Sequence, residues 1–451
     1  MIHNPELRRN IWLDFSMHRL LLTPIILALI TYLAYLTSSK TSESFAFYFA
    51  CFFIFLWGTK AASETVIEEV NNNTWDFQRQ SAISPFSMTI GKWLGSTLYT
   101  WYGASISILF YVMAYHHITP AGQGLIPEIF TLILGGLFAQ ALALLFSLQI
   151  LPQIRHEHSN KTFRYFFAGS FIGIITTSVC LHALKEPLSI TWHHLEIPEA
   201  RFYILSLAAF LIWTVIGLYR SFSKELQYQH IPWIWLLFNI FCMGYFSGFA
   251  SFDLPETSIQ IENINDLKNL FQTTPYYLAF SVISFLTYIA LFTDTLNSIR
   301  YRKLLARLNE NNIIETLQQL PWWVISFGLT ILMGIYTSLV QVNFTGTFEN
   351  VSPRIFILTS LCFLLRDILL VHYFFLSKTP KRAQSTALLY LGILWIALPL
   401  LLNASHLEHL LPALLPSWGQ NTGLALVSTL TQIAIIGFLC WNKWQNIWSK
   451  I

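Results

Sequence analysis

Long apolar runs alternate with short polar segments along the whole chain, and this pattern predicts membrane-spanning helices. A transmembrane helix needs about 20 predominantly apolar residues to cross a hydrocarbon core about 30 Å thick. Twelve segments have this character, near residues 20–38, 44–61, 92–115, 126–151, 165–184, 201–220, 231–250, 275–294, 322–342, 355–377, 385–403 and 423–441. We therefore expect an all-α fold, a polytopic transmembrane helical bundle of about 12 spans.

Composition supports the membrane class and excludes several others. Only 11% of the 451 residues are charged and 54% are hydrophobic, whereas soluble domains carry roughly 25% charged residues. The five cysteines lie in apolar runs without a CxxC pair, so neither a disulfide framework nor a zinc site is indicated. A net charge of +3 is too small to favour nucleic acid as a partner. Outer histidines such as His116, His193 and His406 lack a metal-binding spacing, so we expect no metal and no cofactor bound by this chain.

Basic residues predict the orientation, because Lys and Arg are retained on the cytoplasmic side of a membrane. With the N-terminus inside, the inner segments carry 20 Lys and Arg residues and the outer segments carry five. Both termini are therefore expected in the cytoplasm, with the protein in a bacterial cytoplasmic (inner) membrane. The first apolar run is longer than the apolar part of a signal peptide and is expected to be a retained helix.

The segment before the first span has an amphipathic pattern over residues 4–18. Its apolar positions share one helix face and its charged positions share the other: Ile11, Trp12, Phe15 and Leu20 against Arg8, Arg9, Asp14 and His18. Such a helix suits the headgroup layer of a membrane, so we expect an elbow that leads into the first span. An ordinary juxtamembrane leader is the alternative.

The loop between the second and third spans, residues 62–92, is the most polar part of the first half. Its stretch "NNNTWDFQRQSAISP" places Thr74 as a helix N-cap, and Ser84 followed by Pro85 marks a second helix start. The short helix offers four candidate contact residues: Trp75, Asp76, Phe77 and Arg79. Aromatic residues held outside both lipid and core usually have a partner, so a soluble protein is expected to dock here. The alternative is a loop helix that rests on the protein's own surface.

This loop resembles that of the type-2 superfamily of ABC transporter permeases. In that family a Glu-containing stretch ends the second span, and a coupling helix precedes an "SPxSxxxxGK" start of the third. Here those elements are Glu64, Glu68 and Glu69, then "TWDFQRQSAI", then Ser84, Pro85, Ser87, Gly91 and Lys92. The resemblance implies that the coupling helix binds a cytoplasmic ATPase and transmits its closure to the spans. It also implies that ATP and Mg are bound by that partner, because this chain contains no GxxxxGK[ST] motif.

Permeases of this type commonly have six spans, so twelve indicate two fused six-helix units, residues 1–222 and 223–451. The second unit repeats a cytoplasmic loop, residues 296–321, between its second and third spans. Four basic residues make it the candidate contact for a second ATPase copy: Arg300, Arg302, Lys303 and Arg307. Two alternatives explain these basic residues: they bind anionic membrane lipids, or they are a cluster of positive charge that only sets the orientation of the chain. The chain is expected to act as a monomer of fused halves or as a homodimer.

Two charged residues lie inside the tenth span, in "SLCFLLRDILLVHYFF". Arg366 and Asp367 each cost about 2.5 to 3.5 kcal/mol in a membrane unless paired or hydrated. Adjacent residues point about 100 degrees apart on a helix, so we expect each to find partners on neighbouring helices. Together they are either a gate or pathway lining, or an ion pair that stabilises packing. His372 nearby is expected to be a packed histidine.

These features predict a permease subunit, not itself an enzyme, that exports a hydrophobic or amphiphilic substrate with a separate ATPase. A major-facilitator-like secondary carrier is the first alternative, since such carriers also have twelve spans with both ends inside. Its short Gly- and Arg-rich loop after span two is absent, because residues 62–92 are acidic and aromatic. A polytopic enzyme of lipid or envelope metabolism is the second alternative.

Overall fold

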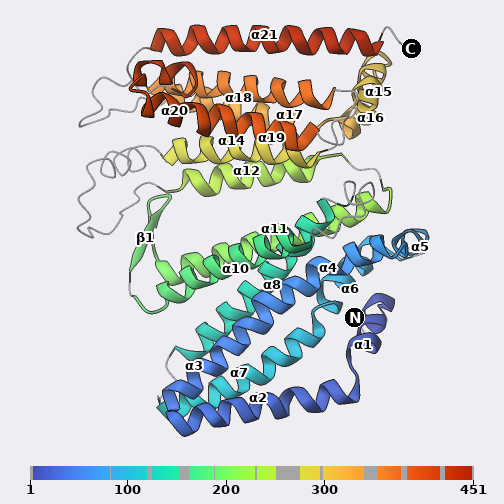
Figure 1. Cartoon of the computed structure of the whole chain (residues 1–451), viewed down its shortest axis with the longest axis vertical. Coiled ribbons are helices and arrows are strands. Elements are labelled where there is room, and N and C mark those ends of the chain that lie inside the picture. The colour runs from blue at the N-terminus through green and yellow to red at the C-terminus, as the bar shows by residue number, and fades with distance from the viewer. Residues whose placement is uncertain are drawn as a thin grey trace. The chain divides into compact units, whose positions relative to one another are not determined.

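The chain is almost entirely helical and divides into two compact units (Figure 1). The computed structural model describes residues 4–81, 83–118, 124–149, 151, 162–186, 188–228, 231–249, 275–294, 298–339, 353–376, 383–416 and 422–448. Unit 1 comprises Met1–Ile190 and Glu196–Gln229, and unit 2 comprises Thr191–Leu195 and His230–Ile451. The all-α prediction is confirmed. Duplication of a six-helix unit stays a prediction.

Ten helices of the described residues are long and apolar enough to cross a membrane, which makes this a multi-pass membrane protein. A shorter apolar helix, Trp233–Ser247, lies at the seventh predicted span. The third predicted span, residues 92–115, is not one helix, because the chain turns at Ser96 and Thr97. A count of twelve spans therefore remains a prediction.

Unit 1 begins with the predicted elbow and continues through long helices. Its helices, in chain order, are α1 (Pro5–Asp14), α2 (Met17–Thr37), α3 (Ser39–Cys51), η1 (Phe52–Trp57), α4 (Gly58–Asn71), α5 (Trp75–Gln80), α6 (Pro85–Gly95), α7 (Leu98–Ile118), α8 (Leu125–Gln149), α10 (Thr162–Ala183) and α11 (Glu199–Glu225). The π-helical turn η1 joins α3 and α4 into one apolar helix of 33 residues. At 1.5 Å per residue this helix is about 50 Å long and exceeds the hydrocarbon core. Its polar end is therefore carried beyond the bilayer.

Small residues let the helices of unit 1 approach closely at its centre. Helix α8 packs against α4, α10 and α11. A Cβ added to Gly173 of α10 would lie 2.3 Å from Ala139 Cβ of α8, and one added to Gly136 of α8 would lie 2.2 Å from Ile54. Such small-residue interfaces are typical of membrane helices, because close backbone approach maximises van der Waals contact where lipid offers no hydrophobic advantage.

Unit 2 is built mainly from long helices that lie side by side, with a crosswise hairpin at one end (Figure 1). Its helices are α12 (Trp233–Ser247), α14 (Pro275–Thr293), α15 (Ser298–Asn309), α16 (Ile313–Gln319), α17 (Trp322–Leu339), α18 (Pro353–Phe375), α19 (Ala383–Gly392), η3 (Ile393–Ala397), α20 (Leu398–Ala404), η4 (Glu408–Ala413) and α21 (Thr422–Trp448). Helix α14 packs against α12 and α17, and α18 packs against α17, α19 and α21.

The two strands of the described residues, β1 (Ser189–Trp192) and β2 (Leu195–Pro198), form a hairpin. Its turn consists of His193 and His194, both with positive φ angles of 45° and 64°. Two consecutive residues of this conformation are characteristic of the type I′ turn that matches the twist of paired strands. These two histidines therefore have a local backbone role.

Candidate functional site

Helix α1 docks on α6 through polar contacts that the sequence pattern did not predict. Asn4 caps α1 by accepting from the backbone N–H of Glu6 at 3.0 Å, and its amide donates to the carbonyl of Ser87 at 2.7 Å. Asn10 donates to the carbonyl of Gly91 at 3.2 Å. Gly91 permits this approach, since an added Cβ would lie 2.4 Å from Glu6 Cβ. The elbow is therefore fastened to the start of the third predicted span.

The last turn of α1 exposes apolar side chains, in keeping with a lipid environment. Trp12 is 82% exposed and Leu13 is 58% exposed, whereas Glu6 and Asn10 are buried. This inverts the usual arrangement of a helix on a soluble protein, where polar residues face outward. A helix with this distribution is expected to lie with its apolar side in the membrane interface.

A buried group of charges, which we call the elbow cluster, joins four helices. It consists of Glu6 and Arg9 of α1, Glu69 of α4, Gln78 of α5 and Lys92 of α6. Lys92 is fully buried, and its Nζ lies 2.5 Å from each carboxylate oxygen of Glu69 and 3.2 Å from Glu6 Oε2. Arg9 pairs with Glu69 and Glu6, and Gln78 donates to Glu69 at 2.8 Å. Elements far apart in the chain are thus tied at one point.

Burial dominates the ionisation of Lys92. Loss of solvent lowers the pKa of Lys92, while the carboxylates of Glu69 and Glu6 act in the opposite direction. A buried ammonium group is costly unless it is paired and hydrogen-bonded. The two carboxylates therefore serve first to keep this lysine in the structure. The ring of Trp75, 5.8 Å from Nζ, adds a cation–π contact.

The expectation that Trp75 is held outside the core is wrong. Its side chain is 1% exposed and packs among Val66, Val70, Met88 and Phe222, with a ring centroid distance of 6.4 Å to Phe222. Trp75 is buried because it is the first residue of α5 and its side chain packs against α4, α6 and α11.

Thr74 occupies the N-cap position of α5 but makes no side-chain capping bond, whereas Ser84 caps α6 as predicted.

The other predicted contact residues of α5 divide between anchoring and exposure. Arg79 is partly buried, and its Nε donates to the carbonyl of Glu225 at 2.9 Å while its Nη1 lies 3.2 Å from Asp76. Phe77 is 77% exposed, and the side chain of Asp76 is 75% exposed. Helix α5 is thus held by Trp75, Gln78 and Arg79, and it presents Asp76 and Phe77 outward.

In unit 2, Arg366 and Asp367 pair with each other, although adjacent residues point about 100 degrees apart on a helix. Both are fully buried in α18, and Arg366 Nε donates to Asp367 Oδ1 at 2.8 Å. The long arginine side chain folds back far enough to overcome the angle between the two Cβ directions. Further hydrogen bonds complete the network: Tyr288 at 2.6 Å and Trp395 at 2.7 Å to Asp367 Oδ2, and Arg366 to Gln432 at 3.1 Å.

These bonds bring residues from α14, η3 and α21 to the pair, so the prediction that neighbouring helices supply partners also holds. The guanidinium lies 4.7 Å from the centroid of the Phe363 ring. His372 is fixed about one and a half turns further on, between the carbonyl of Ile368 and the hydroxyl of Tyr301, each 2.7 Å away. We find this arrangement suited to stabilising helix packing, since its hydrogen-bonding atoms are directed at protein groups.

The four basic residues predicted as a second contact all lie in α15, the first helix of the α15–α16 hairpin (residues 298–319), and do not form one surface. Arg300 is directed inward, 2.5 Å from Asp294 and within hydrogen-bond distance of the carbonyls of Gln319 and Leu320. Arg307 pairs with Glu310 and Glu315, each at 2.7 Å. Arg302 is half-buried and Lys303 is exposed.

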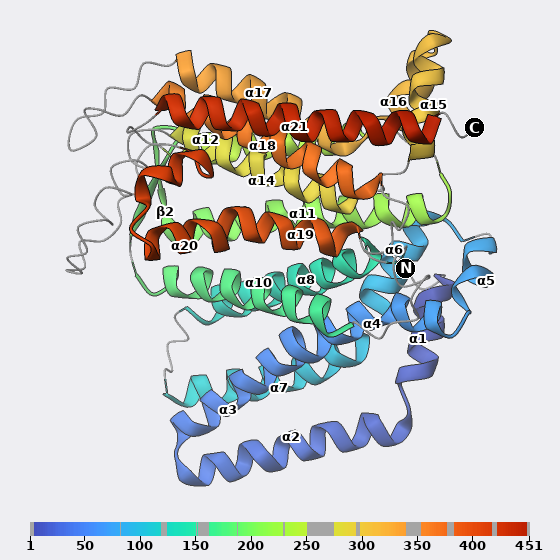
Figure 2. The same cartoon turned by 45° about the horizontal axis from the view of Figure 1, so that its top comes forward.

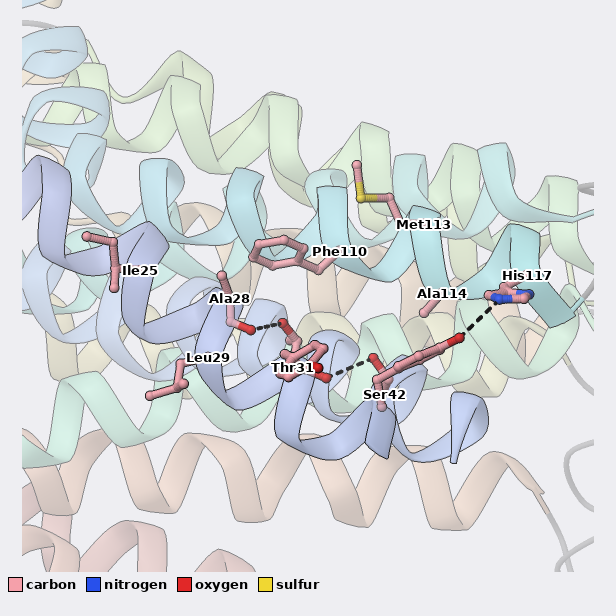
Figure 3. Close-up of a pocket in the computed structure, with 11 residues that line it drawn as sticks. Ile25, Ala28, Leu29, Thr31, Ser42, Phe110, Met113, Ala114 and His117 are labelled. Atoms are coloured by element: carbon pink, nitrogen blue, oxygen red, sulfur yellow. Dashed lines mark hydrogen bonds between the residues drawn. The ribbon is translucent and has the colours of Figure 1, made fainter. Parts of the chain in front are cut away.

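A groove of about 690 Å³ runs between α2, α3 and α7 in unit 1 (Figure 3). Apolar side chains line most of it, including Ile25, Leu29, Phe110 and Met113. Its polar groups bond to one another: Ser42 donates to the carbonyl of Thr31 at 3.2 Å, and the Tyr35 hydroxyl lies 3.3 Å from His117 Nε2. The groove therefore suits an apolar chain better than a hydrated ion.

The sequence pattern includes Glu69 and Lys92 in the loop motif, but it does not predict that Lys92 pairs with Glu69 and Glu6. The available signal was a lysine at the start of an apolar run, together with Glu6 and Asn10 spaced four apart on one face of α1. Comparison with known proteins gives no further guidance: no protein-family model, no curated protein and no solved structure matches this chain.

Proposed function

We propose that this chain is the membrane-spanning permease subunit of an ATP-driven transporter and that a separate ATPase docks on α5. The observation that carries the proposal is the mounting of α5. Three of its side chains, Trp75, Gln78 and Arg79, fasten the helix to the body of unit 1. Phe77, an aromatic residue, stays exposed beside the acidic Asp76. An aromatic side chain on a rigid support is a typical anchor for a protein partner.

The elbow cluster supports a mechanical role for this region. A displacement of α5 acts through Gln78 on Glu69, and through Glu69 on Lys92 and Arg9. Glu69 lies in the last turn of the 33-residue apolar helix, and Arg9 belongs to the elbow. Partner closure is thereby linked to helices in the bilayer without any ATP-binding motif in this chain. In this arrangement α1, α5 and α6 lie on the cytoplasmic side of a bacterial inner membrane.

The cargo we propose is hydrophobic or amphiphilic. Few charges lie in the spans, and the one pair inside α18 is occupied by protein groups. The apolar groove of unit 1 accommodates a hydrocarbon chain along α2 and α7 (Figure 3). Ion conduction, in contrast, needs unpaired polar groups or carbonyls along a hydrated path.

The test is co-purification of the tagged chain from membranes of its native host, followed by measurement of bound ATP hydrolysis. The double change Asp76→Asn and Phe77→Ala removes the exposed charge and the exposed ring, and the side-chain oxygen of the new asparagine can still accept from Arg79. Ile126→Ala is the matched control. Ile126 is 80% exposed in the first turn of α8, which follows the end of α7 that is opposite to α6, so it lies away from α5. Changing Trp75 is unsuitable, since its removal disturbs packing directly.

We expect ATPase activity with the unaltered chain and the Ile126 control, and its loss with the double change. Retention of the ATPase by the doubly altered chain contradicts the contact assignment. Absence of any ATPase from the unaltered chain contradicts the permease and favours a secondary carrier or a membrane enzyme.

A further inference from the structure

The α15–α16 hairpin of unit 2 exposes more aliphatic surface than a polar loop requires. Five of its large side chains are 40% to 72% exposed: Leu305, Leu308, Ile313, Ile314 and Leu317. Ile313 and Ile314 follow directly on the turn between the helices, so the exposed group includes the tip. Exposed apolar residues gathered on one element usually mark a surface that another phase or molecule covers.

The hairpin is held at its root, not at its tip. Arg300 bonds to Asp294 and to the carbonyls before α17, and the Tyr301 hydroxyl contacts His372 at 2.7 Å and receives the Trp323 indole N–H at 3.1 Å. Beyond the root, Arg307 forms ion pairs with Glu310 and Glu315 within the hairpin. The tip is therefore braced internally while its aliphatic side chains remain available.

The direction of the hairpin indicates what covers it. In unit 2 the helices α15 and α16 lie crosswise to the long helices, at the end where α21 terminates (Figure 1). The second view shows them extending past the side of the α17, α18 and α21 group (Figure 2). Helices that span a bilayer run roughly along its normal, so a hairpin that lies crosswise at their ends is expected to run parallel to the membrane surface.

Aromatic residues at the root mark the boundary between lipid and water. Trp322 and Trp323 begin α17, and Trp235 stacks on Trp322 with a centroid distance of 5.6 Å. Tryptophan favours the headgroup level of a bilayer. The hairpin leaves the bundle beside these residues, so its level matches that of the lipid headgroups.

Charge complements the same environment. Between residues 298 and 320 there are four basic residues and two acidic ones, a net charge of +2. Arg300 is turned inward to Asp294, whereas Lys303 and Arg307 are exposed on α15, as are Leu305 and Leu308. An amphipathic, basic helix parallel to a membrane is attracted to anionic lipids and inserts its apolar face.

We propose that the α15–α16 hairpin is a membrane-surface anchor that inserts its tip, with Leu308, Ile313 and Ile314, into a headgroup layer of anionic lipid. This inference is independent of the proposed transport function. It assigns to lipid the hairpin whose basic residues were considered as a second ATPase contact.

The experiment places a photoreactive benzoylphenylalanine at Ile314 of the full chain, reconstituted in nanodiscs of phosphatidylglycerol and phosphatidylcholine. Adducts are identified by mass spectrometry after illumination. Phe77, which is 77% exposed on α5, is the matched position that we expect in water, and Leu430, 56% exposed on α21, is the position expected in lipid. We expect lipid adducts at Ile314 at a yield near that of Leu430 and at least fivefold above that of Phe77.

A second variant tests the charge. Lys303→Glu reverses one exposed basic residue of α15 and is expected to reduce the Ile314 adduct yield severalfold in discs with phosphatidylglycerol. In discs of phosphatidylcholine alone the same change should have little effect. An equal effect in both lipids contradicts the anionic preference.

Two results overturn the anchor itself. One is a yield at Ile314 as low as that at Phe77 in nanodiscs. The other is a protein adduct without a lipid adduct at position 314 when native membranes are illuminated. That result would assign the hairpin to a protein partner.

Discussion

Both units bury charged side chains, but they pair them in opposite ways. In unit 1, Lys92 meets carboxylates from α1 and α4, 86 and 23 positions away in the chain. In unit 2, Arg366 meets its immediate neighbour, Asp367. The same requirement, that a buried charge be paired, is met by charges from different helices in unit 1. In unit 2 it is met by two charges of one helix, to which neighbouring helices add neutral hydrogen-bond partners.

The polar segments that follow the second long helix of each unit differ accordingly. In unit 1, α5 and α6 are fastened by Trp75, Arg79 and the elbow cluster, and Phe77 and Phe86 are their exposed large apolar side chains. In unit 2, the α15–α16 hairpin is held through Arg300 and Tyr301 at its root. A firmly mounted segment suits transmission of force, whereas a hairpin with an aliphatic tip suits insertion.

The largest effect is expected from Lys92→Met. The change leaves the Glu6 and Glu69 carboxylates buried without their lysine, which costs about 5 kcal/mol. We expect a strong drop in thermal unfolding temperature in detergent and early proteolytic release of α1. Lys60→Met is the control, because Lys60 is 58% exposed and its pairing distance to Glu64 is 4.0 Å. Equal stability of the two variants would show that the elbow cluster does not hold α1.

The buried pair of unit 2 is tested by a double-mutant cycle. Asp367→Ala leaves a buried guanidinium unpaired and is expected to lower stability by about 3 kcal/mol. The single change Arg366→Met leaves the carboxylate unpaired, and the double change Arg366→Met with Asp367→Ala removes both charges, so its cost should be smaller than the sum of the two single costs. Thermal unfolding of the unaltered chain, the two single variants and the double variant provides the measurement. A double variant as unstable as the sum of both single variants would contradict direct pairing.

A smaller and local effect is expected from Arg300→Gln. Asp294 loses its ionic partner but keeps the backbone N–H of Trp322 at 3.0 Å, so the cost is about 2 kcal/mol. Hydrogen exchange should rise in α15 and α16 and stay unchanged in α5. Lys303→Gln, at an exposed position of the same helix, should change exchange little. Unchanged protection of the hairpin in the Arg300 variant would show that its root is held in another way.

The smallest effect concerns the close approach of α1 and α6. Gly91→Ala places a methyl group against Glu6 and is expected to cost about 1 kcal/mol. In Gly328→Ala of α17 nothing lies within 4 Å of the added Cβ, and a modest stabilisation is expected from helix propensity. Thermal unfolding compares the two. A neutral Gly91 variant would mean that α1 adjusts its position without loss of contact.

The sequence predicted the helices better than their contacts. Apolar length predicted most of the spans, and Ser84 with Pro85 correctly marked the start of α6. The turn after Gly95 was missed, because "GKWLGSTLYTWYG" is continuously compatible with a helix. Burial of Trp75 was also missed, since exposure in a six-residue helix depends on what lies beside it and not on its own pattern.

The sequence alone determined the membrane class and the division into polar and apolar segments, because these depend on local composition and on the fixed rise of a helix. The tertiary structure alone decided which charges meet. Lys92 with Glu6 and Glu69 is a non-local contact that no spacing rule encodes. Arg366 with Asp367 depends on a side-chain conformation that is stabilised by Tyr288 and Trp395 from other helices. Pairing of buried charge is settled by packing, since only packing brings the partners together and excludes water.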